Sequence, residues 1–249
     1  MVIGKWLMVI WKAVSHHLYT PSPLHPITSS PLHPLTPSSP HLYTPSRYNT
    51  VMNEFLWVIV AFLCGSLPFS VWVGRLALRR DVREFGDGNP GASNVFRAGG
   101  KGWGVAAILL DGFKGAIPVA LAYYWAGLEG WWITAVAIAP ILGHAFSPFL
   151  RFRGGKALAV TFGVWFGLIF WVGPTVLGLS FAFWLWLLAV EGWAVLAGML
   201  TFLVFLQFFP GDWALQAIWL GNFIILAWKH RADLRKKPKI RFFKKSDHE

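Results

Sequence analysis

The sequence predicts an all-α integral membrane protein, built as a bundle of about seven transmembrane helices. Of its 249 residues, 55% are hydrophobic and only 13% are charged, whereas a soluble domain carries about 25% charged residues. From residue 52 onward, apolar stretches follow one another, most of them close to the roughly 20 residues that span a bilayer. The Lys and Arg residues of this part lie between or at the ends of these stretches, almost all where one face of a membrane would be.

Seven apolar segments are the expected spans, at about residues 53–76, 103–125, 131–149, 157–173, 174–190, 193–209 and 213–229. Only Gly173 and Pro174 separate the fourth segment from the fifth, so these two could instead be one broken helix in a six-span protein. The charge pattern favours seven, because the basic connections and the basic C-terminal tail then share one side. The connections on the other side contain no Lys or Arg. The positive-inside rule makes the basic side cytoplasmic, where the tail can also contact anionic lipid headgroups.

Residues 1–51 are expected to form a disordered tail. From residue 15 they are rich in Pro, Ser, Thr and His, and they repeat HLYTPS and SPLHP. Such a composition cannot bury enough apolar surface to fold. Because Met52 directly precedes the first apolar stretch, we expect it to be the natural start and residues 1–51 to be a start-site artefact. Residues 52–249 are then a polytopic membrane domain with a basic cytoplasmic tail.

Composition also argues against several classes of function. The net charge of +11 is explained by membrane orientation, and no basic soluble module exists that could bind nucleic acid. Cys64 is the only cysteine, so neither an internal disulfide nor a four-cysteine metal site can form. The sequence has no Walker-type nucleotide motif and no plausible metal cluster. We therefore expect no metal, no cofactor and no nucleic-acid partner.

The loop of residues 86–97, GDGNPGASNVFR, is the first candidate site. Its glycines and asparagines permit a backbone that exposes successive N–H groups, and such concavities bind phosphate or carboxylate oxygens. Arg97 can add a bidentate guanidinium contact. The alternative is an ordinary flexible connection, but the basic residues around this loop favour anion binding.

Two further motifs carry buried or glycine-flanked charges. Asp111 and Lys114 are three residues apart within a span, so they share a helix face; they are either functional or a structural ion pair. Gly154 and Gly155 precede Lys156 and the next expected helix, an arrangement that suits an anion. His144 lies near the end of the preceding span and is either functional or a hydrogen-bonded packing residue.

The last motif begins where the seventh span ends. His230 and Asp233 are three residues apart, so the carboxylate could orient the imidazole for general-base work. Taken alone, a basic membrane boundary whose side chains reach toward water explains this motif better. Together, the four motifs place two anion sites and one or two histidines at one membrane face, which favours a reaction between two anionic substrates.

In this order, the motifs resemble the acyl-phosphate-dependent glycerol-3-phosphate acyltransferases of bacterial inner membranes. The motifs are GSLPF at 65–69, GNPGASNVFR at 88–97, LDGFKG at 110–115, GHAFSPFLRFRGGK at 143–156 and KHR at 229–231. The resemblance covers about residues 52–240. It implies a seven-helix enzyme that moves a fatty acyl group from acyl phosphate to the 1-hydroxyl of glycerol 3-phosphate. The product is lysophosphatidic acid for phospholipid synthesis, formed at the cytoplasmic face without metal or coenzyme A.

The resemblance also implies roles for individual residues. Catalytic roles fall to Arg97, His144, Lys156 and His230, and substrate-binding roles to Asp87, Gly88, Asn89, Gly91, Asn94, Gly154, Gly155 and Asp233. The attacking hydroxyl would lose its proton either to His230 or to a phosphate oxygen of the substrate. The acyl chain would enter between helices from the membrane lipids.

This chain departs from the family pattern at its anion-handling motifs. Asp87 replaces the usual Ser, Ala157 and Val160 replace Gly and Thr, and Asp233 replaces Asn. A carboxylate beside a phosphate site repels the ligand unless a cation pairs with it. The departures leave open a divergent relative with another phosphorylated acceptor or without activity. A transporter for an anionic metabolite is a further alternative, although charges along a midplane path and an inverted repeat are not apparent.

Overall fold

The computed structural model describes residues 47–242, with side chains from residue 52 onward. The expected disordered tail therefore lies outside the described residues, except that the first helix already begins at Arg47, before Met52. In the described range the regular secondary structure is helical, apart from a single bridge between Leu188 and Ile240. The all-α prediction is confirmed.

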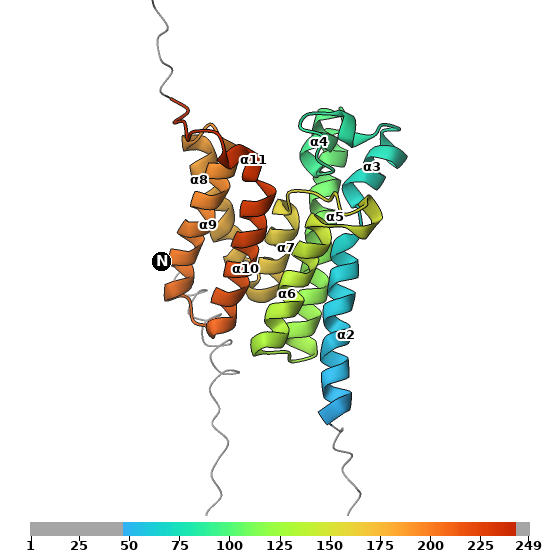
Figure 1. Cartoon of the computed structure of the whole chain (residues 1–249), viewed down its shortest axis with the longest axis vertical. Helices are drawn as coiled ribbons and strands as arrows, with labels where there is room; N and C mark the ends of the chain where they lie inside the picture. Colours follow the sequence, from blue (N-terminus) through green and yellow to red (C-terminus); the bar gives the residue numbers. More distant parts are fainter. Residues whose placement is uncertain (1–46, 243–249) are drawn as a thin grey trace, which may run out of the picture. The chain divides into compact units, whose positions relative to one another are not determined.

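The longer helices follow the expected spans (Figure 1). They are α2 (Arg47–Ser66), α3 (Phe69–Ala77), α5 (Lys101–Ala120), α6 (Gly130–Ala145), α7 (Leu158–Ile169), α8 (Val172–Leu187), α9 (Glu191–Phe208) and α10 (Trp213–Lys229). Two short helices, α4 (Ala92–Arg97) and α11 (Arg231–Leu234), lie outside the spans. By length and hydropathy, four segments can cross a membrane unaided, namely Met52–Ala77, Lys101–Trp125, Gly130–Leu150 and Glu191–Phe208. Because α7 and α8 are apolar but shorter, a total of seven spans stays a prediction.

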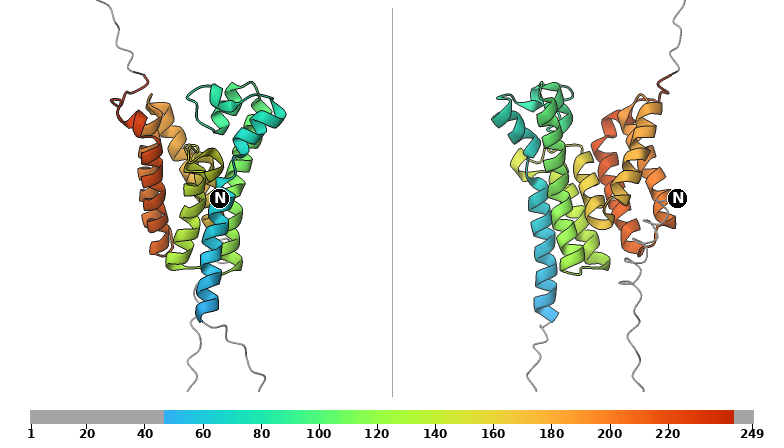
Figure 2. Two further views of the ribbon diagram at one scale, coloured as in Figure 1. Left: turned by 45° about the vertical axis from the view of Figure 1, so that its right-hand side comes forward. Right: turned by 180° about the vertical axis from the view of Figure 1, so that it is seen from behind.

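Two spans are interrupted where the sequence did not place a break. The first span divides at Leu67 and Pro68 into α2 and α3, which run in different directions (Figure 2), because Pro68 has no N–H to continue the helical ladder.

The break between the fourth and fifth spans lies at Phe170, where φ is 45°. The expected break at Gly173 and Pro174 was wrong by a few residues. Both residues lie in the first turn of α8, where a proline is tolerated because its missing N–H would have no helical partner.

A buried polar cluster stabilises the break in the first span. Lys114 Nζ donates to the Leu67 carbonyl, at 2.7 Å, and to Asp111 Oδ1, at 2.6 Å. Ser70 Oγ donates to Asp111 Oδ2, at 2.5 Å. The cluster joins α5 to both sides of the break and provides partners for groups that would otherwise be buried without one. Asp111 and Lys114 therefore pair as the sequence suggested.

The helices approach each other closely at glycines and bury aromatic side chains. A Cβ at Gly163 would lie 1.9 Å from the Gly112 carbonyl oxygen, so α7 and α5 meet backbone to backbone. Deeper in the bundle, Trp165 packs edge-on against Phe202, with ring centroids 4.7 Å apart.

Large apolar side chains also cover much of the outer surface, among them Ile117, Leu179, Val204, Phe208 and Ile224. Such a surface suits contact with lipid tails rather than water.

Candidate active site

One large pocket, with a volume of about 1060 Å³, lies at the end of the bundle where α4 and α11 are found (Figure 1). Its polar side is formed by the loop before α4, the connection between α6 and α7, the start of α9 and the residues from the end of α10 into α11. Its apolar side includes Leu158 of α7, Phe181 and Leu185 of α8, and Val195 of α9. The pocket can therefore hold a charged group beside a hydrocarbon chain.

The first glycine-rich loop folds around the Asp87 carboxylate. Asp87 Oδ1 accepts hydrogen bonds from the Asn89 backbone N–H and from Asn94 Nδ2, each at 3.2 Å. Asn94 Nδ2 also donates to the Asn89 carbonyl, at 2.8 Å, so this buried side chain fixes the turn from beneath. Gly88 has a φ of 72°, a value that a side chain would make costly. Donors of the predicted anion concavity are thus occupied by a carboxylate of the protein itself.

The second loop is shaped by contact with the end of α6. A Cβ at Gly154 would lie 2.0 Å from the His144 carbonyl oxygen, and a Cβ at Gly155 would lie 2.3 Å from His144 Nε2. Only glycine fits at either position. Lys229 Nζ donates to the carbonyls of Ala145 and Gly154, both at 2.9 Å, and so ties the loop to the end of α10.

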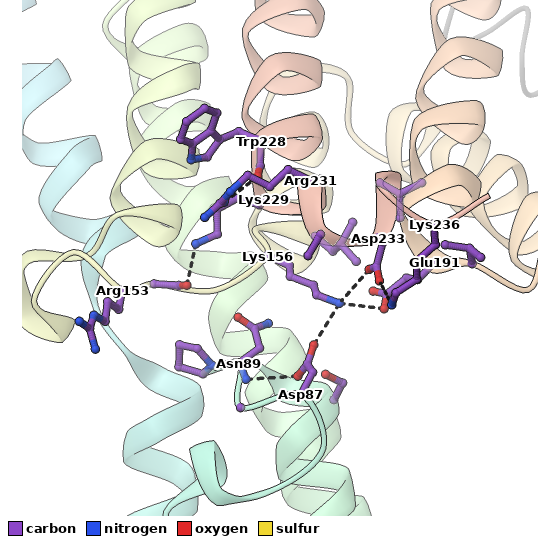
Figure 3. A pocket seen from close by; sticks show the side chains of 18 of the residues that line it. Asp87, Asn89, Arg153, Lys156, Glu191, Trp228, Lys229, Arg231, Asp233 and Lys236 are labelled. Atoms are coloured by element: carbon purple, nitrogen blue, oxygen red, sulfur yellow. Dashed lines mark hydrogen bonds and ion pairs between the residues drawn. The ribbon is translucent and has the colours of Figure 1, made fainter. Parts of the chain in front are cut away.

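Left-handed backbone conformations bracket the same loop. Arg151, Phe152 and Ala157 have φ values of 52°, 61° and 66°, which cost energy in residues other than glycine and occur mostly where surrounding contacts impose them. Ala157 is the N-cap of α7. Lys156 lies just before it and points into the pocket (Figure 3).

Three carboxylates from three separate elements converge on Lys156 (Figure 3). Its Nζ lies 2.9 Å from Glu191 Oε2, 3.0 Å from Asp87 Oδ2 and 3.8 Å from Asp233 Oδ2. Burial alone would lower the pKa of Lys156, but the hydrogen bonds and charges of Glu191 and Asp87 raise it above its usual value. Burial alone would raise the pKa of Asp87, but bonds from Lys156, Asn89 and Asn94 hold it below its usual value.

Other cations face the pocket without a carboxylate partner. Among the residues that the structure describes, Arg97, Arg153, Lys229 and Arg231 line the pocket, and none of them forms an ion pair there. Arg153, Lys229 and Arg231 lie on one side of Lys156, opposite Glu191 and Asp233 (Figure 3). The pocket is thus divided into a charge-compensated side and a side with unpaired positive charge. The second side can accept an anion without breaking an existing ion pair.

The structure brings most of the predicted site residues to this pocket. Asp87, Gly88, Asn89, Arg97, Gly154, Lys156 and Asp233 line it, whereas Gly91, Asn94, His144, Gly155 and His230 do not. Gly91 is the N-cap of α4. His144 and Gly155 border a separate cavity of only about 10 Å³ beside Asp111 and Lys114. His144 therefore contacts the second loop at Gly155, and neither residue lines the main pocket.

His230 is 1% exposed and lies behind Glu191 as seen from the pocket. Its Nδ1 lies 2.9 Å from the Leu226 carbonyl oxygen, and its Nε2 lies 3.8 Å from Glu191 Oε1. A substrate in the pocket as it stands would meet Glu191 before it met the imidazole.

Sequence reasoning missed several pocket residues. Glu191, Lys229, Arg153, Arg231 and Lys236 all line the pocket but were not among the predicted site residues. The signal for Glu191 was present, since it is an acidic residue in a very short connection on the basic side of the membrane. Among the described residues, no group of three or more His, Cys, Asp or Glu side chains is arranged to hold a metal ion.

Known proteins share this sequence and fold. The family model described as glycerol-3-phosphate acyltransferase matches residues 55–238. Glycerol-3-phosphate acyltransferase 1 of Thermotoga maritima is 38% identical over 200 residues, which cover 74% of this chain and 98% of that protein. Glycerol-3-phosphate acyltransferase of Maridesulfovibrio salexigens is 37% identical over 192 residues, which cover 76% of this chain and 95% of that protein.

Solved structures agree with these relatives. The crystal structure of PlsY, an integral membrane glycerol 3-phosphate acyltransferase, in its glycerol 3-phosphate form is 30% identical to this chain, with a TM-score of 0.65. The similarity covers 74% of this chain and 90% of PlsY. The lysophosphatidic acid form of the same protein gives a TM-score of 0.66 at 28% identity. Because the family match covers most of the chain and the fold agrees, this protein belongs to the glycerol-3-phosphate acyltransferase family of integral membrane enzymes.

Proposed function

We propose that this protein transfers a fatty acyl group from acyl phosphate to the 1-hydroxyl of glycerol 3-phosphate, giving lysophosphatidic acid and inorganic phosphate. The observation that carries this proposal is a single pocket with cationic, glycine-rich loops on one side and an apolar wall on the other. Relatives of this chain are named for the acceptor reaction, and PlsY has a glycerol 3-phosphate form and a lysophosphatidic acid form.

The two substrates share the pocket according to their polarity. The phosphates of donor and acceptor bind at the cationic side, near Arg97 and Lys156 and the unpaired Arg153, Lys229 and Arg231. Two like-charged phosphates repel each other, and these cations offset that repulsion. The acyl chain lies along Leu158, Phe181, Leu185 and Val195, where burial of its methylene groups stabilises the complex by about 0.8 kcal/mol per CH₂.

The reaction is an acyl transfer between oxygens. The acceptor hydroxyl oxygen forms a bond to the acyl carbon, the bond from that carbon to the phosphate oxygen breaks, and phosphate leaves with the bonding electron pair. The hydroxyl proton passes to a phosphate oxygen of the substrate. The position of His230 behind Glu191 supports this route over direct proton transfer to the imidazole. Fixed positive charge at the developing oxyanion supplies the stabilisation typical of such sites.

The pocket faces the cytoplasm of a bacterial inner membrane in this proposal, and the C-terminus lies on the same side. The support is the grouping of Lys and Arg residues in the connections that surround the pocket. From this side, the enzyme reaches soluble glycerol 3-phosphate, while a lipidic donor approaches along the bilayer.

The test is an assay of the purified protein in detergent with acyl phosphate and labelled glycerol 3-phosphate. Lysophosphatidic acid formation that Lys156→Ala abolishes supports the proposal, because Lys156 joins both loops of the site. Exchange of acyl phosphate for acyl-coenzyme A tests the donor and should give no product.

The two alternative functions, a transporter and a non-catalytic relative, predict different results with the same purified protein. Flux of an anionic metabolite into proteoliposomes without product would identify a transporter. Absence of both flux and product would identify a non-catalytic relative.

A further inference from the structure

Lys156, Glu191 and His230 form a chain that runs from the pocket into the protein. Lys156 Nζ donates to Glu191 Oε2 at 2.9 Å, and Glu191 Oε1 lies 3.8 Å from His230 Nε2. Each carboxylate oxygen of Glu191 thus faces a different partner. The side chain of Lys156 is 20% exposed and that of His230 is 0% exposed, so the three residues connect a substrate-facing cation with a fully buried ring.

The two ring nitrogens of His230 face different groups. Nδ1 faces the Leu226 carbonyl, and Nε2 faces Glu191. The Leu226 carbonyl can only accept, so Nδ1 carries the hydrogen of that bond. Nε2 is buried and makes no hydrogen bond within the described residues. The Glu191 carboxylate lies 3.8 Å from it, and through this carboxylate the ring can influence the pocket.

The backbone around Glu191 is held firmly in place. Glu191 is the first residue of α9. Just before it, the Ala189 N–H donates to the Lys239 carbonyl, at 2.8 Å. Just after it, a Cβ at Gly192 would lie 2.8 Å from the Asp233 Cβ and 3.2 Å from the His230 Cβ. The start of α9 is therefore packed directly against the turn that carries His230, which fixes the carboxylate between its two partners.

Glu191 differs from the other two carboxylates at Lys156 in the partners that it contacts. Asp87 is shared with Asn89 and Asn94 of the first loop, and Asp233 is shared with the exposed Lys236, at 2.8 Å. Only Glu191 bridges Lys156 and His230.

We propose that Glu191 is a positioning residue that couples His230 to Lys156, so that His230 influences the reaction through Glu191 and not by contact with substrate. The inference rests on the proposed acyltransferase function and adds to it a residue that places the ammonium of Lys156 at the substrate phosphates. Loss of the Glu191 charge would leave that ammonium with Asp87, at 3.0 Å, and the more distant Asp233, at 3.8 Å. The ammonium would then move toward Asp87 and the first loop.

A double-mutant cycle tests the coupling. Glu191→Gln keeps the shape but removes the charge, and His230→Gln removes the ring. Each should lower kcat on the order of tenfold, with a smaller change in the KM for glycerol 3-phosphate, as expected for one charge-assisted hydrogen bond. The double variant should be no slower than the slower single variant, because both changes break the same chain. A loss equal to the product of the two single losses would show that His230 acts independently and would overturn the proposal.

Asp233→Asn is the matched control, since it removes another carboxylate that faces Lys156. Combined with His230→Gln, its effect should multiply with that of the histidine change. Glu191→Asp keeps the charge and should recover part of the kcat lost in Glu191→Gln. Equal losses in both Glu191 variants, with unchanged thermal unfolding in detergent, would contradict a role for the charge.

The cycle can also be measured without turnover. If the wild-type protein makes no lysophosphatidic acid, the proposed function fails, and calorimetric binding of inorganic phosphate to the same four proteins still tests the coupling. If Lys156, Glu191 and His230 are coupled, the loss of phosphate affinity in the double variant should be smaller than the product of the losses in the two single variants. Independent losses would overturn the inference whatever the outcome of the assay.

Discussion

The Asp87 carboxylate lies 3.0 Å from the Lys156 ammonium, and so joins the two glycine-rich loops of the pocket to each other. Asp87 also accepts the hydrogen bonds of Asn89 and Asn94. A carboxylate thus holds the donors that would otherwise be available to a phosphate. Any phosphate that binds to this loop must displace Asp87 or tolerate its charge.

Replacement of this carboxylate should improve acceptor binding. Asp87→Ser removes the negative charge and leaves a hydroxyl that can donate to a phosphate oxygen, so the KM for glycerol 3-phosphate should fall by about three- to tenfold, as expected for removal of one repulsive contact. Steady-state kinetics at fixed acyl phosphate measure this. An unchanged or higher KM would contradict the competition between Asp87 and the ligand.

The matched control for this variant is Asp81→Asn. Asp81 is the N-cap of the short helical turn Val82–Glu84 and pairs with Arg83 and Arg75, but it does not line the pocket. Its replacement should leave the KM unchanged. A fall of similar size in both variants would indicate a general effect of net charge on the acceptor.

The same ion pair should make stability depend on pH. The pKa of Asp87 is lower in the folded protein than its usual value, so the carboxylate stabilises the fold above about pH 4, its ordinary range. This contribution is lost as the pH falls through the lowered pKa. Thermal unfolding in detergent between neutral and acidic pH should therefore show a smaller loss of stability in Asp87→Ser than in the wild type. Parallel curves would show that Asp87 contributes nothing to acid sensitivity.

Much of this protein could be predicted from its sequence because membrane insertion imposes simple patterns. Hydropathy predicted the apolar helices, and the distribution of Lys and Arg predicted that the glycine-rich loops gather at one end of the bundle. Motif resemblance supplied seven residues that line the pocket, including Arg97 and Lys156. These signals are local in the sequence, or are shared with a family.

The remaining features depend on contacts between distant segments. Glu191 became part of the site only when the start of α9 met Lys156 and the end of α10. The break lies at Phe170 and not at the Gly173 and Pro174 pair, because Pro174 has no N–H to offer the carbonyl four residues earlier and is itself accepted in the first turn of α8. No periodicity could have shown that His230 is buried behind a carboxylate.

The second loop should not tolerate a side chain at Gly155. In Gly155→Ala the added Cβ would lie 2.3 Å from His144 Nε2, so the loop or the histidine must move, at an expected cost of about 1–3 kcal/mol in the free energy of unfolding. Because Lys156 follows directly, we also expect at least a tenfold loss of kcat/KM, which corresponds to about 1.4 kcal/mol. Thermal unfolding and steady-state kinetics measure the two effects.

Gly102→Ala is the control for this substitution. Gly102 lies in the first turn of α5, and a Cβ there meets nothing within 4 Å. Alanine is the better helix former by up to about 1 kcal/mol, so stability should be unchanged or slightly higher and activity unchanged. Wild-type activity in Gly155→Ala would show that the close contact with His144 does not constrain the site.

The apolar wall of the pocket should set the length of acyl chain that the enzyme accepts. Leu185 lies on α8 and lines the pocket, whereas Leu179 lies on the same helix, is 68% exposed and does not line it. Leu185→Trp would fill space that the acyl chain of the donor occupies. The kcat/KM for long acyl phosphates should therefore fall by about tenfold or more relative to short ones, since loss of a few buried methylene groups is sufficient. Leu179→Trp adds the same ring to the outer surface and should leave the ratio unchanged. Competition between long and short acyl phosphates in one reaction measures the ratio directly, and an equal shift in both variants would mean that the acyl chain lies along some other part of the bundle.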